Sequence, residues 1–298
     1  MMNAAASRDR QRLLAGLPLT ERRVRLAGTD TALLEGGNGP PLVLVHGGIE
    51  CGGAYWAPVV PGLAERHRLI VPDVPGLGES APLSQIDAPG FGRWFEALLD
   101  STCEDRPAVV AHSLLGGLTA DFAAHHRGRL DQLCIYAAPG IWPYRMPLRL
   151  RAVGVRFALR TNRRNNERFE RFALLDRDRT RLRDPAWFDS FSAYSLARAR
   201  TPAVKRTMNQ LVRVGTRRVS DATLRRIDAS VGLLWGSGDR MVPIGLAYRT
   251  RSRLGWPLSV VADAAHAPHI ERPQTFVARL EQMLSPPFEP TLSPEAAR

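Results

Sequence analysis

The 298-residue sequence is poor in lysine, since Lys205 is the only lysine among 41 basic residues. The formal net charge is +12. The arginines are densest between Arg145 and Arg226, where they alternate with acidic residues in segments such as 168–171 and 176–179. Nucleic-acid binding modules instead concentrate charge on one motif with interleaved aromatics. We therefore expect a solvated arginine-rich helical surface and no nucleic-acid partner, with attraction of anions as the alternative role of the charge.

Cysteine and long apolar runs are also scarce. The three cysteines, Cys51, Cys103 and Cys134, form neither a paired framework nor a metal-binding spacing, which is typical of a reducing compartment. No stretch reaches the roughly 20 apolar residues that a membrane span needs. Residues 1–12 are polar and lack the apolar core of a secretory signal. These absences predict a cytoplasmic protein without a membrane span.

Apolar runs of strand length recur along the chain and alternate with helical patterns such as Phe91 to Leu99 and Pro273 to Leu284. Alternation of this kind predicts an α/β protein with a mostly parallel, twisted sheet and helices on both faces. The runs are Pro41 to Val45, Leu69 to Val71, Ala108 to Val110, Leu133 to Ala137, Val231 to Trp235 and Leu258 to Val261.

The alternation stops in residues 141–227, which show helical patterns only. A helical insertion between two strands is the position of a cap or lid. We therefore predict a leader segment (1–22), a core in two parts (23–140 and 228–285), a helical cap (141–227) and a flexible tail (286–298).

Ser113 follows the buried run Ala108 to Val110 and precedes a helical stretch. A sharp strand-to-helix turn exposes a serine hydroxyl and directs the next backbone N–H groups toward whatever the hydroxyl attacks. Small residues are typical two positions before and after such a serine, and here Ala111 and Leu115 occupy those positions. Leu115 is expected to crowd the turn, and the glycine pair at 116–117 offers room one residue later.

Asp239 and His266 each follow a predicted strand, where the carboxyl ends of parallel strands line the functional crevice. Histidine can accept the serine proton near neutral pH, and aspartate can orient the histidine. The N–H groups of Gly48 and Leu114 are the candidates for an oxyanion hole.

Several other residues could compete for these roles. His269 is a weaker alternative base because it lies a helix turn beyond the strand. His112 is expected to pack beneath the serine, and His46 is expected to be a structural turn residue. Asp263 is too close to His266 in sequence to be the favoured acid.

Together these segments resemble the α/β-hydrolase superfamily, specifically its small-molecule serine hydrolases with a helical cap. The matching pieces are Val45 to Gly48, Asp73 to Ser80, Ala111 to Ser113, Trp235 to Asp239 and His266 to Pro273. The resemblance implies the triad Ser113, Asp239 and His266, in the chain order of that superfamily. It also implies hydrolysis without a cofactor.

The expected reaction is hydrolysis of an ester, lactone or thioester of a small apolar molecule, through an acyl-enzyme on Ser113. Hydrolysis of a carbon–carbon bond by the same triad is one alternative, and a repurposed non-hydrolytic biosynthetic or ligand-binding protein is another. The sequence leaves the oligomeric state open between monomer and dimer. Aromatic residues of the cap either line the substrate pocket or bury the cap against the core. They are Trp142, Tyr144, Trp187, Phe188, Phe191 and Tyr194.

Overall fold

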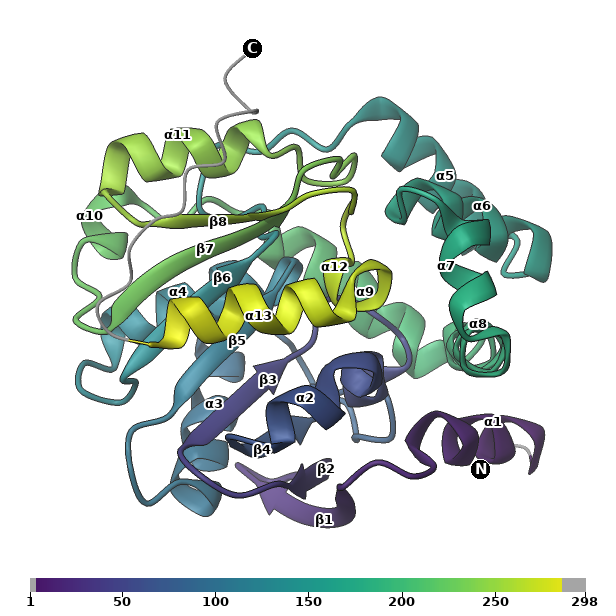
Figure 1. Cartoon of the computed structure of the whole chain (residues 1–298), viewed down its shortest axis with the longest axis horizontal. Helices are drawn as coiled ribbons and strands as arrows, with labels where there is room; N and C mark the ends of the chain where they lie inside the picture. Colours follow the sequence, from purple (N-terminus) through teal and green to yellow (C-terminus); the bar gives the residue numbers. More distant parts are fainter. Residues whose placement is uncertain (1–3, 286–298) are drawn as a thin grey trace.

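A computed structural model describes residues 4–285, which form one eight-stranded sheet flanked by helices (Figure 1). The predicted apolar runs lie in strands of this sheet, except that the run Leu133 to Ala137 ends one residue beyond its strand. The strands are β1 (Thr20–Leu26), β2 (Thr29–Gly36), β3 (Pro41–Val45), β4 (Arg68–Pro72), β5 (Ala108–His112), β6 (Gln132–Tyr136), β7 (Ser230–Gly236) and β8 (Leu258–Val261).

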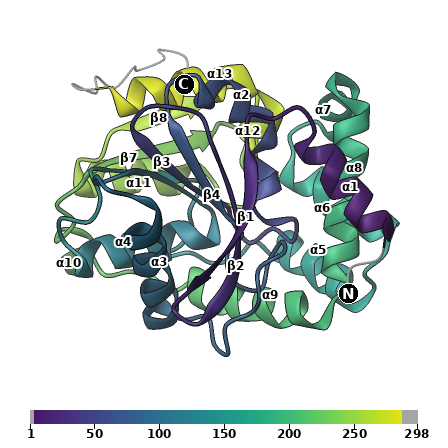
Figure 2. The ribbon, with the colours of Figure 1, turned by 90° about the horizontal axis from the view of Figure 1, so that it is seen from below.

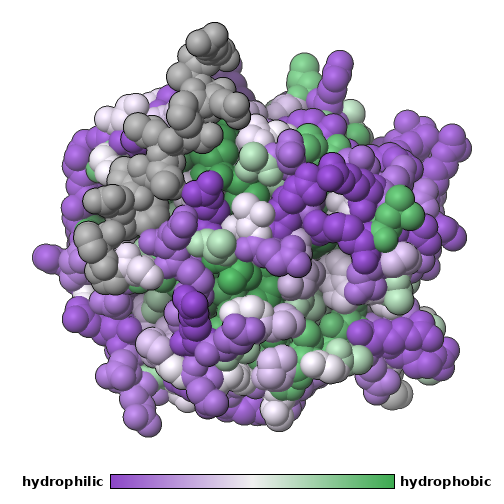
Figure 3. Space-filling model, viewed as in Figure 1, coloured by the Kyte–Doolittle hydropathy of each residue, from purple (hydrophilic) through white to green (hydrophobic). Residues whose placement is uncertain are grey.

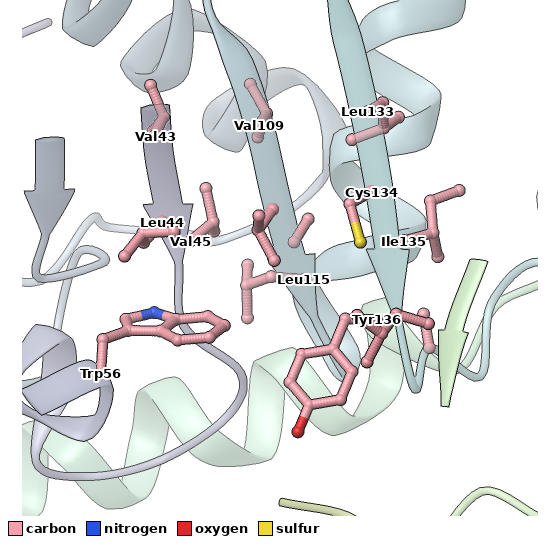
Figure 4. Close-up of a cluster of buried hydrophobic side chains, with 14 of the residues drawn as sticks. Val43, Leu44, Val45, Trp56, Val109, Leu115, Leu133, Cys134, Ile135 and Tyr136 are labelled. Carbon is pink, nitrogen blue, oxygen red and sulfur yellow. The ribbon is translucent and has the colours of Figure 1, made fainter. Parts of the chain in front are cut away.

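The strand order is β1-β2-β4-β3-β5-β6-β7-β8. β2 pairs antiparallel with β1 and β4, and all the other pairs are parallel. The central strands are covered on both faces, so nearly every residue of β3, β5 and β6 is buried. Figure 4 shows part of the apolar cluster that results, with Val43, Val109 and Ile135 projecting from these three strands. The predicted fold class is confirmed.

Helices flank this sheet on both faces. The 3-10 helix η1, α2 and α13 pack together along one face, and α3 and α4 pack together on the other. The helices are α1 (Ala4–Leu14), η1 (Gly52–Val59), α2 (Val60–Ala64), α3 (Ala88–Thr102), α4 (Leu114–His125), α5 (Leu148–Leu159), α6 (Arg163–Ala173), α7 (Arg177–Arg183), α8 (Pro185–Ala199), α9 (Pro202–Gly215), α10 (Asp221–Leu224), α11 (Gly245–Leu254), α12 (Pro268–Glu271) and α13 (Pro273–Leu284).

Six helices, α5 to α10, follow one another between β6 and β7, and no strand interrupts them. We call residues 148–224 the helical insertion. Its first four helices gather beside the sheet in Figure 1, beyond the ends of the parallel strands. The all-helical pattern of residues 141–227 thus corresponds to one continuous helical segment inserted between β6 and β7.

Residues 4–22 are the described part of the predicted leader segment. They contain α1 and the start of β1. α1 packs against α8 of the helical insertion, as Figure 2 also shows. The contact buries Leu13, which is 1% exposed, and Arg10, which pairs with Glu21. The predicted tail, 286–298, lies outside the described residues.

Candidate active site

Ser113 lies between the last residue of β5 and the first residue of α4, in a strained conformation with φ 54° and ψ −127°. Positive φ at a residue with a Cβ costs about 1–3 kcal/mol and persists only where the surroundings impose it. The N–H of Ser113 donates to the carbonyl of Tyr136 on the neighbouring strand at 2.8 Å, and its own carbonyl accepts from the N–H of Gly116 at 3.0 Å. Both bonds hold the turn that presents the hydroxyl.

Leu115 does not crowd this turn, because its side chain points away from it. Leu115 is fully buried and joins the apolar cluster in Figure 4 that includes Val45 and Tyr136. The position that requires glycine is Gly116, where a Cβ would lie 2.5 Å from the Cβ of Ala138. The expected crowding is therefore avoided, and the close packing of the helix start falls one residue later.

Ser113, His266 and Asp239 form a continuous hydrogen-bonded chain. Nε2 of His266 lies 3.0 Å from Oγ of Ser113, and Nδ1 of His266 lies 2.8 Å from Oδ2 of Asp239. A carboxylate can only accept, so Nδ1 carries the proton and Nε2 is left to accept from the serine hydroxyl. Oδ1 of Asp239 accepts from the N–H groups of Met241 and Val242 at 2.8 and 2.9 Å, which holds the carboxylate in place.

The other histidines near the site have different partners. Nδ1 of His269 lies 2.9 Å from the hydroxyl of Tyr136, and burial lowers the pKa of His269 well below its usual value. His112 donates from Nε2 to the carbonyl of His266 at 3.1 Å, beneath the His266 ring. His46 accepts from the N–H of Val74 at 2.9 Å, and burial lowers its pKa to about 4. None of these three lies within hydrogen-bonding distance of Ser113 in the described residues.

The turn after β3 approaches Ser113 closely because residue 47 has no side chain. A Cβ on Gly47 would lie 2.9 Å from the Cβ of Ser113. The next residue, Gly48, lies against Leu114, since a Cβ there would be 2.8 Å from Cδ1 of Leu114. Leu114 is the first residue of α4, so its N–H has no acceptor within the helix. Both predicted oxyanion-hole residues thus lie side by side next to the serine.

A cavity of about 680 Å³ opens onto Ser113 and His266. It extends between the core and the helical insertion, and α5 and α9 supply much of its wall. Gly48 and Leu114 line it, as do Tyr144 and Phe191. Its size is that of a site for a small organic molecule.

Four of the six candidate aromatic residues lie outside the lining of this cavity. Trp142 stacks under the guanidinium of Arg253 at 4.2 Å, and Trp187 stacks on Phe191. Tyr194 is fully buried and donates a hydrogen bond to Glu79. Phe188 is also buried away from the cavity. These four side chains pack against other helices or the core, which was the alternative to lining the pocket.

The cavity wall also carries charged side chains that the sequence analysis did not single out. Glu50 follows the turn after β3 and is half-buried. Removal from water raises the pKa of Glu50 to about 7. Arg151, Lys205 and Arg213 add cationic groups from the helical insertion. A small number of charged groups in a mostly apolar cavity can orient a polar part of a ligand.

Glu271 connects the His266 loop to the helical insertion. Its carboxylate accepts from the N–H of Ala265 at 2.6 Å and from the N–H of Leu175 at 2.6 Å. The N–H of His266 itself donates to the carbonyl of Ala173 at 3.0 Å. Glu271 lies in a segment that carries the family resemblance, but no local pattern shows which N–H groups it meets. The residue is therefore visible in the sequence, whereas its role is not.

Residues 4–285 contain neither a cluster suited to a metal ion nor a membrane-spanning helix. No group of three or more His, Cys, Asp or Glu side chains could hold a metal ion there. No helix in that range is long and apolar enough to cross a membrane.

The sequence profile of the Alpha/beta hydrolase family matches residues 42–280. The chain belongs to this family. Its sheet, its serine turn and the chain order of Ser113, Asp239 and His266 agree with the resemblance noted in the sequence. A comparison with curated proteins gives no match.

Several solved structures share the fold. The 2-hydroxy-6-oxo-6-phenylhexa-2,4-dienoate hydrolase from Rhodococcus sp. strain RHA1 is 19% identical, with a TM-score of 0.78 over 90% of this chain and 99% of that one. Naproxen esterase from Bacillus subtilis is 15% identical, with a TM-score of 0.77 over 96% and 100%. A membrane phospholipase A described as a bacterial virulence factor is 21% identical, with a TM-score of 0.74 over 94% and 90%. Likeness at these identities establishes the fold alone.

Proposed function

We propose that this protein is a serine hydrolase that cleaves an ester, lactone or thioester of a small apolar molecule through an acyl-enzyme on Ser113. The observation that carries the proposal is the chain of contacts from Ser113 Oγ through His266 to Asp239, at 3.0 and 2.8 Å. Neutral serine is a poor nucleophile and needs a base within reach, which this chain supplies.

In the proposed reaction, His266 removes the hydroxyl proton as Oγ of Ser113 attacks the substrate carbonyl carbon. The N–H groups of Gly48 and Leu114 stabilise the oxyanion that forms. The His266 imidazolium returns its proton to the leaving group, and Asp239 stabilises that positive charge. Water activated by His266 then hydrolyses the acyl-enzyme and regenerates the serine. No cofactor takes part in any of these steps.

The helical insertion serves as the cap in this proposal, because its helices line the cavity above Ser113. Tyr144 and Phe191 offer apolar surface to the substrate. A second candidate reaction is hydrolysis of a carbon–carbon bond in a dicarbonyl compound by the same three residues. The cationic side chains of Arg151, Lys205 and Arg213 favour it, since such a substrate can carry a carboxylate.

A fluorophosphonate probe tests the nucleophile. We expect stoichiometric labelling of the wild type, loss of labelling in Ser113→Ala, and full labelling in the matched control Ser101→Ala on the exposed side of α3. Absence of labelling in folded wild-type protein, with Ser113→Ala fully active on its substrate, would refute the serine mechanism.

A substrate panel then separates the two reactions. p-Nitrophenyl esters of increasing chain length, lactones and a dicarbonyl compound are compared by kcat/KM. Preference for the esters or lactones supports acyl hydrolysis. Turnover of the dicarbonyl compound alone supports the second candidate.

A further inference from the structure

Helix α5 carries an apolar stripe that faces solvent. Leu148, Val155 and Leu159 are 78%, 58% and 79% exposed. Their spacing of seven and four residues places them on one side of the helix. Leu150 is the only buried residue of α5. A contiguous apolar stripe on an exposed helix marks a surface that contacts something else.

The same region is strongly basic and has no acidic residue between positions 132 and 166. All of its arginines are exposed, and among the described residues only Arg163 has an acidic partner, Glu167. The arginines are Arg145, Arg149, Arg151, Arg156, Arg160, Arg163 and Arg164. On the face of the molecule seen in Figure 3, hydrophilic side chains dominate where the insertion helices lie and hydrophobic ones stand among them.

We propose that α5 docks on an anionic membrane surface, with its leucines at the boundary of the acyl chains and its arginines at the headgroups. A helix with an apolar side and an arginine-rich flank binds in this way, in the plane of the interface. The charge of this region also favours a membrane, rather than a second copy of the chain, as the partner of α5. A symmetric dimer through α5 would bring two unbalanced arginine clusters together.

The location of α5 gives the docking a consequence for the substrate. The side of α5 that carries Leu150, Gly154 and Phe157 lines the cavity above Ser113, and Val155 belongs both to the stripe and to the cavity wall. Docking therefore brings the α5 wall of the cavity to the bilayer surface. If the proposed hydrolase function holds, the substrate is a lipophilic ester that partitions into membranes. The docking itself does not depend on that function.

Co-sedimentation of the full chain with vesicles tests the docking without any turnover. We expect binding to vesicles of phosphatidylcholine mixed with phosphatidylglycerol, and much weaker binding to phosphatidylcholine alone. One arginine near an anionic bilayer strengthens binding by about fivefold, so Arg149→Gln/Arg156→Gln/Arg160→Gln should weaken it on the order of a hundredfold. Leu148→Ser/Leu159→Ser should weaken it by about tenfold or more. None of these five residues lines the cavity.

Matched controls separate the stripe from general charge and hydrophobicity. Arg93→Gln/Arg106→Gln/Arg249→Gln removes the same charge from exposed positions outside the insertion, and Leu182→Ser removes an exposed leucine from α7. Both control variants should lose less vesicle binding than the α5 variants lose. Activity on a short water-soluble ester should be unchanged in the α5 variants, so loss of docking and loss of hydrolysis are separate readouts.

Three outcomes would overturn the inference. One is the absence of wild-type binding to the anionic vesicles, and another is α5 variants that bind as well as the wild type. The third is a dimer in solution that Leu148→Ser/Leu159→Ser dissociates, because the stripe would then be covered by a second copy. If the wild-type protein binds the vesicles but hydrolyses no ester, the docking is supported. That result would contradict only the proposed function.

Discussion

Glu271→Gln should weaken both the fold and the catalytic step, because this carboxylate joins the His266 loop to the helical insertion. Its two oxygens accept from the N–H groups of Ala265 and Leu175. Glutamine keeps one acceptor oxygen and places an amide N–H₂ against the other donor. One buried N–H loses its partner, at a cost of about 2–3 kcal/mol.

The same substitution should also slow the catalytic step, because it loosens the backbone next to His266. Ala265 directly precedes His266, so a loosened loop moves the imidazole relative to Ser113. A misplacement of about 1 Å can cost roughly a hundredfold in rate. We expect kcat to fall by about tenfold to a hundredfold with a smaller change in KM, since the cavity wall is largely retained. The melting temperature should fall by about 5 °C.

The assays are steady-state kinetics well below the melting temperature and thermal unfolding of the same preparations. Glu104→Gln, at an exposed position, is the matched control and should change neither quantity. A Glu271→Gln protein with wild-type kcat and wild-type melting temperature would refute the reasoning. A lower melting temperature with unchanged kcat would show that Glu271 stabilises the fold without positioning His266.

Two further predictions concern the turn after β3 and the start of α4. Burial raises the pKa of Glu50 from 4.5 to about 7, so its contribution to stability is present below about pH 4.5 and is lost as the pH rises through 7. Glu50→Gln should therefore be more stable than the wild type by about 2 kcal/mol near pH 8, with little difference near pH 4, in denaturant unfolding; a pH-independent difference would contradict the assignment. Gly116→Ala should cost about 1–3 kcal/mol and abolish probe labelling, because its Cβ would lie 2.5 Å from that of Ala138. Gly245→Ala is the control, because a Cβ added at that position would meet no atom within 4 Å. Equal stability of the two variants would contradict the packing argument.

The fold was predictable because its signals are local. Val43, Val109 and Ile135 belong to apolar runs of strand length, and burial on both faces of a parallel sheet demands such runs. The candidate triad was predictable for a related reason. Ser113, Asp239 and His266 each follow a strand, and the ends of parallel strands meet at one edge of the sheet. Their assignment as catalytic residues stays a prediction until the serine is labelled.

The pocket aromatics were predicted less well. A helix places a side chain toward the cavity or toward a neighbouring helix according to how it is rotated, and that depends on every partner it packs against. Tyr144 lines the cavity whereas Tyr194, on α8, is buried against Glu79. Nothing in the composition of this segment distinguishes the two tyrosines.

By itself, then, the sequence determined the alternation of helices with the strands β3 to β8, the turn at Ser113 and the residues available for chemistry, because periodicity and turn residues are local properties. Only the tertiary structure decided that Leu115 turns into the core, that Glu271 meets the N–H of Leu175, and that α5 leaves its leucines uncovered. Each of these depends on contacts between segments far apart in the chain. Such contacts are set by packing, and no window of sequence contains them.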